Sequence, residues 1–113
     1  MTKEKGKISI LNENDFNSFV NDKKKNLVIV DFFAEWCGPF QIMSGVIEKL
    51  AEKNPNVSFA KINVDENPKL SEEYEISSIP CVVFFQDGKE VDRLIGGRGP
   101  EPFQEKIDDY LKS

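Results

Sequence analysis

The chain has 113 residues, of which 39% are hydrophobic and 31% charged, and this composition predicts one globular domain over residues 1–113 with a flexible tail at 1–6. Its 15 basic and 20 acidic residues give a net charge of −5, which argues against nucleic acid or an anionic membrane as the partner. With no His and two Cys, the chain excludes His-dependent catalysis, His-ligated metal sites and a disulfide-dense scaffold. We therefore expect no metal and no cofactor.

Targeting signals are not apparent in the sequence. No apolar run approaches the roughly 18 residues that a membrane-spanning helix needs. The basic N-terminus is not followed by the apolar stretch of a signal peptide. We expect a cytoplasmic protein, in a compartment where thiols are normally kept reduced.

The first half of the chain alternates between strands and helices. Residues 7–11 predict a short strand, and the apolar run at 27–33 is typical of a strand buried on both faces. Asn12 or Asn14 is expected to cap the helix between them. That helix presents one apolar face, made of Phe16, Phe19 and Val20.

A strong helical pattern follows residues 36–40, with Pro39 suited to the first helical position. Its apolar residues recur with helical spacing at Met43, Val46, Ile47, Leu50 and Ala51. The later elements expected are a strand at 57–64, a short helix at 68–74, strands at 81–86 and 90–95 joined by an Asp-Gly turn, and a last helix around 103–111. The order predicts an α/β fold, with a central mixed sheet and helices on both faces.

Cys37 lies where a buried strand gives way to a helix. The helix dipole and the unpaired first-turn N–H groups stabilise a thiolate there, which lowers the pKa of the cysteine and makes it nucleophilic. A lone cysteine is more often a small buried hydrophobe. The neighbours Trp36, Gly38 and Pro39 indicate a turn rather than core, and so favour the reactive interpretation.

Asp31 interrupts the apolar strand, and alternation places it on one face with Ile29 and Phe33. Burial should raise the pKa of its carboxyl, which makes it a candidate proton acceptor near Cys37. A wet strand face or a lysine partner is the alternative. Lys61 could reach Asp31 if their strands are neighbours, although an exposed lysine is also consistent with the pattern.

Four stretches of the chain together resemble the thioredoxin family. They are Val30 to Pro39 (VDFFAEWCGP), Lys61 to Asp65 (KINVD), Ile79-Pro80, and Gly96 after the last strand. The resemblance runs in order through nearly the whole chain and implies the thioredoxin fold.

The resemblance also implies roles for individual residues. Cys37 matches the attacking cysteine, Asp31 the buried acid and Lys61 the lysine close to that acid. Pro80 matches the cis-proline that faces the attacking cysteine. The apolar groove that receives an extended partner chain would include Trp36, Gly38, Pro39, Ile79, Pro80 and Gly96.

One departure from the family motif Trp-Cys-Gly-Pro-Cys affects the chemistry. Phe40 occupies the position of the second cysteine, which normally resolves the mixed disulfide. Cys81 stands after Pro80, where thioredoxins usually carry threonine, and it could substitute if its Cα lies within roughly 4.4–6.8 Å of that of Cys37. Alternation along the strand could equally turn Cys81 into the core.

Three functional hypotheses therefore stay open. In the first, Cys37 attacks a substrate disulfide and Cys81 resolves the mixed disulfide. In the second, Cys37 is the only reactive thiol of the chain and an external thiol resolves the mixed disulfide. The third is a redox-inactive binding module that holds an extended partner segment in the apolar groove. The expected partners are a disulfide- or thiol-bearing protein or a small thiol, with a thioredoxin reductase or glutathione for recycling. We expect the protein itself to be a monomer.

Overall fold

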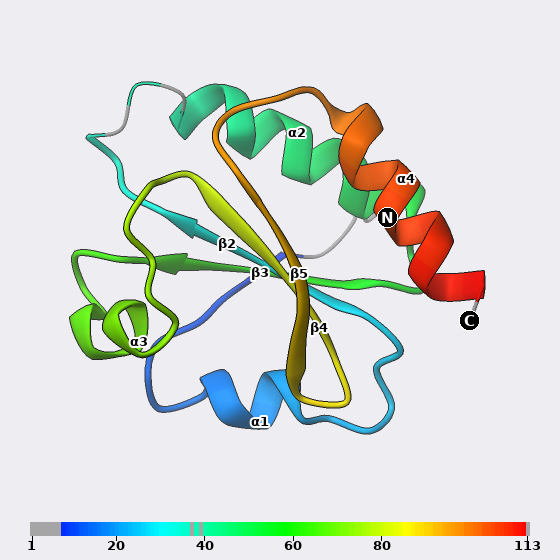
Figure 1. Cartoon of the computed structure of the whole chain (residues 1–113), viewed down its shortest axis with the longest axis horizontal. Helices are drawn as coiled ribbons and strands as arrows, with labels where there is room; N and C mark the ends of the chain where they lie inside the picture. The colour runs from blue at the N-terminus through cyan, green and yellow to red at the C-terminus, as the bar shows by residue number, and fades with distance from the viewer. Residues whose placement is uncertain (1–7, 37, 39, 113) are drawn as a thin grey trace, which may run out of the picture.

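A computed structural model describes residues 8–36, 38 and 40–112 of the chain (Figure 1). The expected tail at 1–6 lies outside these residues. The strands are β1 (Ile8–Ile10), β2 (Val28–Phe33), β3 (Ser58–Asn63), β4 (Cys81–Gln86) and β5 (Lys89–Ile95). The helices are α1 (Phe16–Val20), α2 (Phe40–Lys53), α3 (Pro68–Glu73) and α4 (Pro100–Lys112). The element order predicted from the sequence is confirmed.

The five strands form one mixed sheet in the order β1-β3-β2-β4-β5. β1 and β2 both pair with β3 in parallel, whereas β4 runs antiparallel to β2, and β5 antiparallel to β4. The helices α2 and α4 cover one face of the sheet, and α1 and α3 the other (Figure 1). The expected mixed sheet between two helical layers is therefore confirmed.

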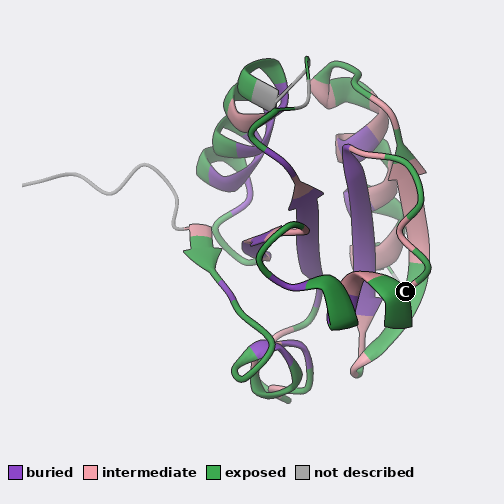
Figure 2. Ribbon diagram, turned by 90° about the vertical axis from the view of Figure 1, so that its left-hand side faces the viewer, coloured by how far each residue is buried: buried purple, intermediate pink, exposed green. Residues whose placement is uncertain are grey.

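Each face of the sheet has its own hydrophobic core, because strand residues alternate between the faces. On the α2 and α4 side, strand residues such as Ile29 and Phe84 pack against helix residues such as Met43 and Phe103. On the α1 and α3 side, Phe32, Cys81 and Phe85 pack with Phe16 and Leu70. Figure 2 shows the buried residues concentrated in the central strands between these layers.

The start of α1 differs from the sequence-based expectation. The residue at its N-cap is Asp15, not Asn12 or Asn14. The Asn12 side chain instead accepts hydrogen bonds from the backbone N–H groups of Asn14 and Asp15, at 2.8 and 3.2 Å, and so shapes the turn before the helix. Asparagine serves turns and caps equally well, so sequence alone does not separate the two uses. Among the described residues, no helix is both long enough and apolar enough to cross a bilayer.

Candidate functional site

The strand register brings most of the sequence-predicted site positions to one end of the sheet. β2 and β3 are parallel and end there, and β4 begins there because Phe32 pairs with Cys81. β5 returns to the same end, where Ile95 also pairs with Cys81. The loop after β2, the loop before β4 and the loop after β5 are thus neighbours, as Figure 1 shows. Cys37 and Pro39, which belong to the first of these loops, lie outside the described residues.

Asp31 lies near the middle of this arrangement, in β2, with only 2% of its surface exposed. Its Oδ1 atom has no hydrogen-bond partner within the part of the chain that the structure describes. Burial raises the pKa of the carboxyl from 3.8 to about 6, and the nearby charge of Lys61 opposes part of that rise. The rise expected from the interrupted apolar strand is therefore present.

Lys61 lies directly beside Asp31, since the two are register partners in the parallel β2–β3 pair. The lysine is half-buried rather than exposed. Its Nζ atom donates a hydrogen bond to Ser44 Oγ at 3.0 Å and lies 5.2 Å from the ring centroid of Phe33. Sequence reasoning placed the lysine but missed Ser44, which comes from α2 on the covering layer.

Trp36 is 70% exposed and lies in the loop between β2 and α2. Its indole Nε1 donates a hydrogen bond of 2.7 Å to Asp65 Oδ2. Asp65 follows β3, and its backbone N–H is bound by the Asn63 side chain at 2.8 Å. A carboxylate from a second loop therefore holds the exposed aromatic ring of the residue that precedes Cys37 in the sequence. Gly38, which follows Cys37 in the sequence, is also exposed.

The peptide bond between Ile79 and Pro80 is cis, as the resemblance implied. The Gly96 backbone N–H donates to the Pro80 carbonyl oxygen at 2.9 Å, which ties the loop before β4 to the loop after β5. Gly96 has a φ of +95°, a backbone conformation that side chains disfavour. Three of the proposed groove residues are therefore held together by backbone contacts.

Cys81 points into the opposite face of the sheet from Asp31. Its side chain is 1% exposed, within the core on the α1 and α3 side. Arg93 Nη1 lies 3.9 Å from its sulfur, and the other terminal nitrogen of Arg93 donates to the Tyr74 carbonyl oxygen at 2.9 Å. Burial raises the pKa of the Cys81 thiol, although the guanidinium of Arg93 acts in the other direction.

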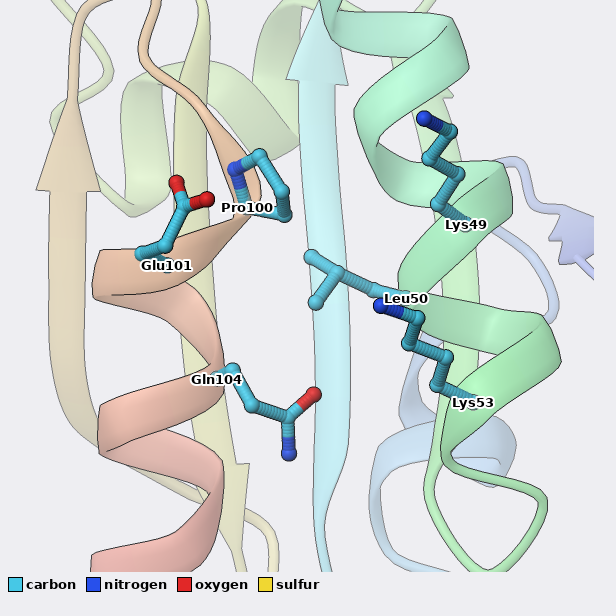
Figure 3. Close-up of a pocket in the computed structure, with 6 residues that line it drawn as sticks. All are labelled: Lys49, Leu50, Lys53, Pro100, Glu101 and Gln104. Atoms are coloured by element: carbon cyan, nitrogen blue, oxygen red, sulfur yellow. The ribbon is translucent and has the colours of Figure 1, made fainter.

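A separate cleft lies between α2 and α4, on the flank of the molecule (Figure 3). Its lining consists of Lys49, Leu50, Lys53, Pro100, Glu101 and Gln104. Gln104 bridges the two helices by exchanging hydrogen bonds of 2.8 and 3.0 Å with Asn54. Of the sequence-predicted site residues that the structure describes, none lines this cleft.

The comparisons with known proteins agree on one family. The family model described as Thioredoxin matches residues 7–109. The chain is 46% identical over 94 residues to a thioredoxin of Chlamydia pneumoniae, covering 83% of this chain and 89% of that protein.

Solved structures show the same likeness. An N21Q mutant thioredoxin from Halobacterium salinarum NRC-1 superposes with a TM-score of 0.86 at 31% identity, covering 97% of this chain and 96% of the other. A second solved structure concerns the thiol resolving mechanism in yeast mitochondrial 1-Cys peroxiredoxin via glutathione/thioredoxin systems. One of its chains superposes with a TM-score of 0.81 at 33% identity, covering 90% of this chain and 94% of the other. The fold is the thioredoxin fold, and the matches support thiol–disulfide redox function in general.

Proposed function

The chain belongs to the thioredoxin family, and from that premise we propose that Cys37 carries out monothiol thiol–disulfide exchange. The observation that carries this proposal is the buried carboxyl of Asp31 beside the half-buried Lys61, in the strand that leads into the loop bearing Cys37. A binding surface alone gains nothing from an ionisable carboxyl buried in its core, because such a group costs stability.

In the proposed reaction, the Cys37 thiolate attacks one sulfur of a substrate disulfide. A Cys37–substrate disulfide forms, the substrate S–S bond breaks, and the second substrate sulfur leaves as a thiolate that takes up a proton. An external thiolate then attacks the Cys37 sulfur and releases the first substrate thiol. A second external thiolate frees Cys37, so that two external thiols become one disulfide while the substrate disulfide becomes two thiols.

Asp31 is the proton acceptor and donor in this scheme. With a pKa of about 6, its carboxyl is mostly ionised near neutral pH and still accepts a proton readily. It can therefore take the proton of the Cys37 thiol before attack, and return one to the departing thiolate.

An external resolving thiol suits the chain better than Cys81. Phe40 has no nucleophilic group at the position of the family's second cysteine. Cys81 is enclosed in the core on the other face of the sheet, and its raised pKa keeps the thiol protonated. We propose glutathione or a reductase as the recycling partner, a disulfide-bearing protein as the substrate, and the cytoplasm as the compartment.

Mass spectrometry of the native protein equilibrated with oxidised and reduced glutathione tests this proposal. We expect one glutathione on Cys37 and a free thiol at Cys81, whereas protein unfolded in denaturant should be modified at both. The Cys37→Ser variant should take up none in the native state. An internal disulfide between Cys37 and Cys81 would replace the monothiol scheme with a two-cysteine one.

The variant Phe40→Cys sharpens the test. We expect it to form an internal disulfide with Cys37 and to reduce insulin disulfides at least about tenfold faster than the parent, because resolution becomes intramolecular. Phe40→Ala is the matched control, since it removes the ring without adding a thiol. Equal rates for Phe40→Cys and Phe40→Ala would contradict the idea that the missing thiol limits turnover.

The exposed indole of Trp36 also fits the alternative of a redox-inactive binding module. A parent protein whose Cys37 never exchanges with glutathione, together with partner binding that survives Cys37→Ser, would favour that alternative.

A further inference from the structure

The inference drawn here rests on the proposed function, because it concerns the proton acceptor of the same site. We propose that Ser44 is a positioning residue. Its hydroxyl holds the Lys61 ammonium group against the α2 face of the sheet, beside Asp31, and so keeps the carboxylate ready to accept a proton. Ser44 acts through Lys61 and does not touch the substrate.

The sheet register places Asp31 and Lys61, and the packing of α2 on the sheet places Ser44 beside them. Asp31 and Lys61 are partners in a parallel pair, so their side chains point to the same face. Their neighbours along the strands, Ile29 and Phe59, pack in the core beneath α2. Ser44 lies in the first half of α2, and its Oγ atom accepts the Lys61 Nζ hydrogen bond at 3.0 Å.

A half-buried lysine usually extends its ammonium group toward water, because hydration of the charge is favourable. Here the Nζ atom is held back by the Ser44 hydroxyl on one side and lies 5.2 Å from the Phe33 ring centroid on another. A neutral hydroxyl does not compete for the positive charge as a carboxylate would. The charge of Lys61 acts on the Asp31 carboxyl and opposes part of the rise in its pKa.

The position of that charge matters because, in the part of the chain that the structure describes, this face of the sheet packs against mostly apolar side chains. Among the described residues, the groups that α2 and α4 contribute to this core are apolar side chains, such as Met43 and Phe103. β4 contributes the apolar side chains of Val82 and Phe84 to it, and Leu94 of β5 packs against this core. Lys61 is the group that opposes the effect of burial on the Asp31 pKa. Releasing Lys61 toward water should therefore raise the Asp31 pKa further.

The test is a direct titration of the Asp31 carboxyl carbon by NMR on the full chain labelled at aspartate. We expect Ser44→Ala to raise the midpoint by about 0.5 pH unit, less than the roughly one to three that a close opposite charge supplies. Ser44→Thr retains the hydroxyl and should restore the parent midpoint. A midpoint that is unchanged or lower in Ser44→Ala would overturn the proposal.

A double-mutant cycle separates positioning from a general structural effect. Lys61→Met should raise the midpoint more than Ser44→Ala does, and adding Ser44→Ala to Lys61→Met should change nothing further. An equal shift from Ser44→Ala in both backgrounds would contradict the proposal. Ser71→Ala is the matched control: Ser71 is a half-buried helical serine in α3, and its removal should leave the Asp31 titration unchanged.

The titration follows the Asp31 carboxyl itself and not exchange at Cys37, so its outcome is distinct from that of the proposed function. The pH profile of Cys37 alkylation provides the second measurement. If Asp31 shifts in Ser44→Ala as expected and the alkylation profile moves with it, both proposals stand. If Asp31 shifts while the alkylation profile stays fixed, the positioning role of Ser44 stands and the role of Asp31 as proton acceptor fails.

Discussion

Asp31 and Cys81 are buried to nearly the same extent, 2% and 1% exposed, in adjacent strands of one sheet. The loss of hydration raises the pKa of both side chains, because the charged form suffers more from burial than the neutral one. For the carboxyl, the rise to about 6 brings its titration close to neutral pH. For the thiol, whose ordinary pKa is already above neutral pH, a rise in pKa moves its ionisation still further from neutral pH.

Their partners increase this contrast. Lys61 is the register partner of Asp31, and its Nζ atom donates a hydrogen bond to the neutral hydroxyl of Ser44. Arg93, beside Cys81, is already engaged by Glu90 through two contacts of 2.6 and 2.8 Å. Burial thus lets the Asp31 carboxyl titrate near neutral pH on one face of the sheet and keeps the Cys81 thiol protonated on the other.

The largest effect is expected from Asp31→Asn, measured by urea unfolding from pH 4 to 8. The native chain binds the Asp31 proton more tightly than the unfolded chain does, so stability falls as the pH rises from 3.8 to about 6 and stays lower above that value. The variant should therefore be more stable than the parent at pH 8, by up to about 3 kcal/mol. At pH 4, the lower end of this range, the difference should shrink to about 0.5 kcal/mol.

Asp87→Asn is the matched control, because Asp87 is exposed in the turn between β4 and β5. It should keep the pH dependence of the parent. Parallel stability curves for the parent and Asp31→Asn across this pH range would show that Asp31 is hydrated, and the contrast with Cys81 would then fail.

A smaller effect is expected from Cys81→Ala. Removing the buried sulfur should lower the free energy of unfolding by about 1 kcal/mol, since a small cavity replaces it. The rate of glutathione exchange at Cys37, measured by mass spectrometry, should match that of the parent. Loss of exchange in Cys81→Ala without loss of folding would assign this thiol a chemical role.

The smallest effect is expected from Glu90→Gln, which removes the charge that pairs with Arg93. Both side chains are partly exposed, at 25% and 29%, so the free energy of unfolding should fall by only about 0.5 kcal/mol. The difference should shrink in high salt. Glu105→Gln on α4 removes an exposed glutamate and serves as the comparison; an equal loss in both variants would show that the ion pair contributes nothing of its own.

The fold could be predicted from the sequence because apolar residues repeat with a different spacing in its strands and in its helices. The apolar run at 27–33 and the helical spacing from Met43 to Ala51 each exclude the other kind of element. The Asp-Gly pair predicted the β4–β5 turn, which the structure confirms. The cap of α1 was predicted wrongly, since the side chains of Asn12 and Asp15 can both bind the backbone of such a turn.

The site was only partly accessible from sequence. Asp31 was identified because it interrupts an apolar strand, and Lys61 because it could reach Asp31 if their strands were neighbours and because it also matches a family position. Ser44 carried no signal: a serine in a helix is unremarkable until the helix is placed over β3, and 17 residues separate it from Lys61. Arg93 was missed for the same reason, since its contact with Cys81 requires the pairing of β4 and β5. Contacts between layers depend on tertiary packing, which periodicity does not encode.

The hydrogen bond between Trp36 and Asp65 has a practical consequence. Trp36 is the chain's single tryptophan, and both tyrosines lie outside its loop. Light absorbed selectively by indole is therefore emitted from one place, directly before Cys37. A partner that covers the ring should shift this emission to shorter wavelengths, because the indole leaves water. The protein thus contains its own optical probe, and engagement of the loop can be followed in real time without attaching a label.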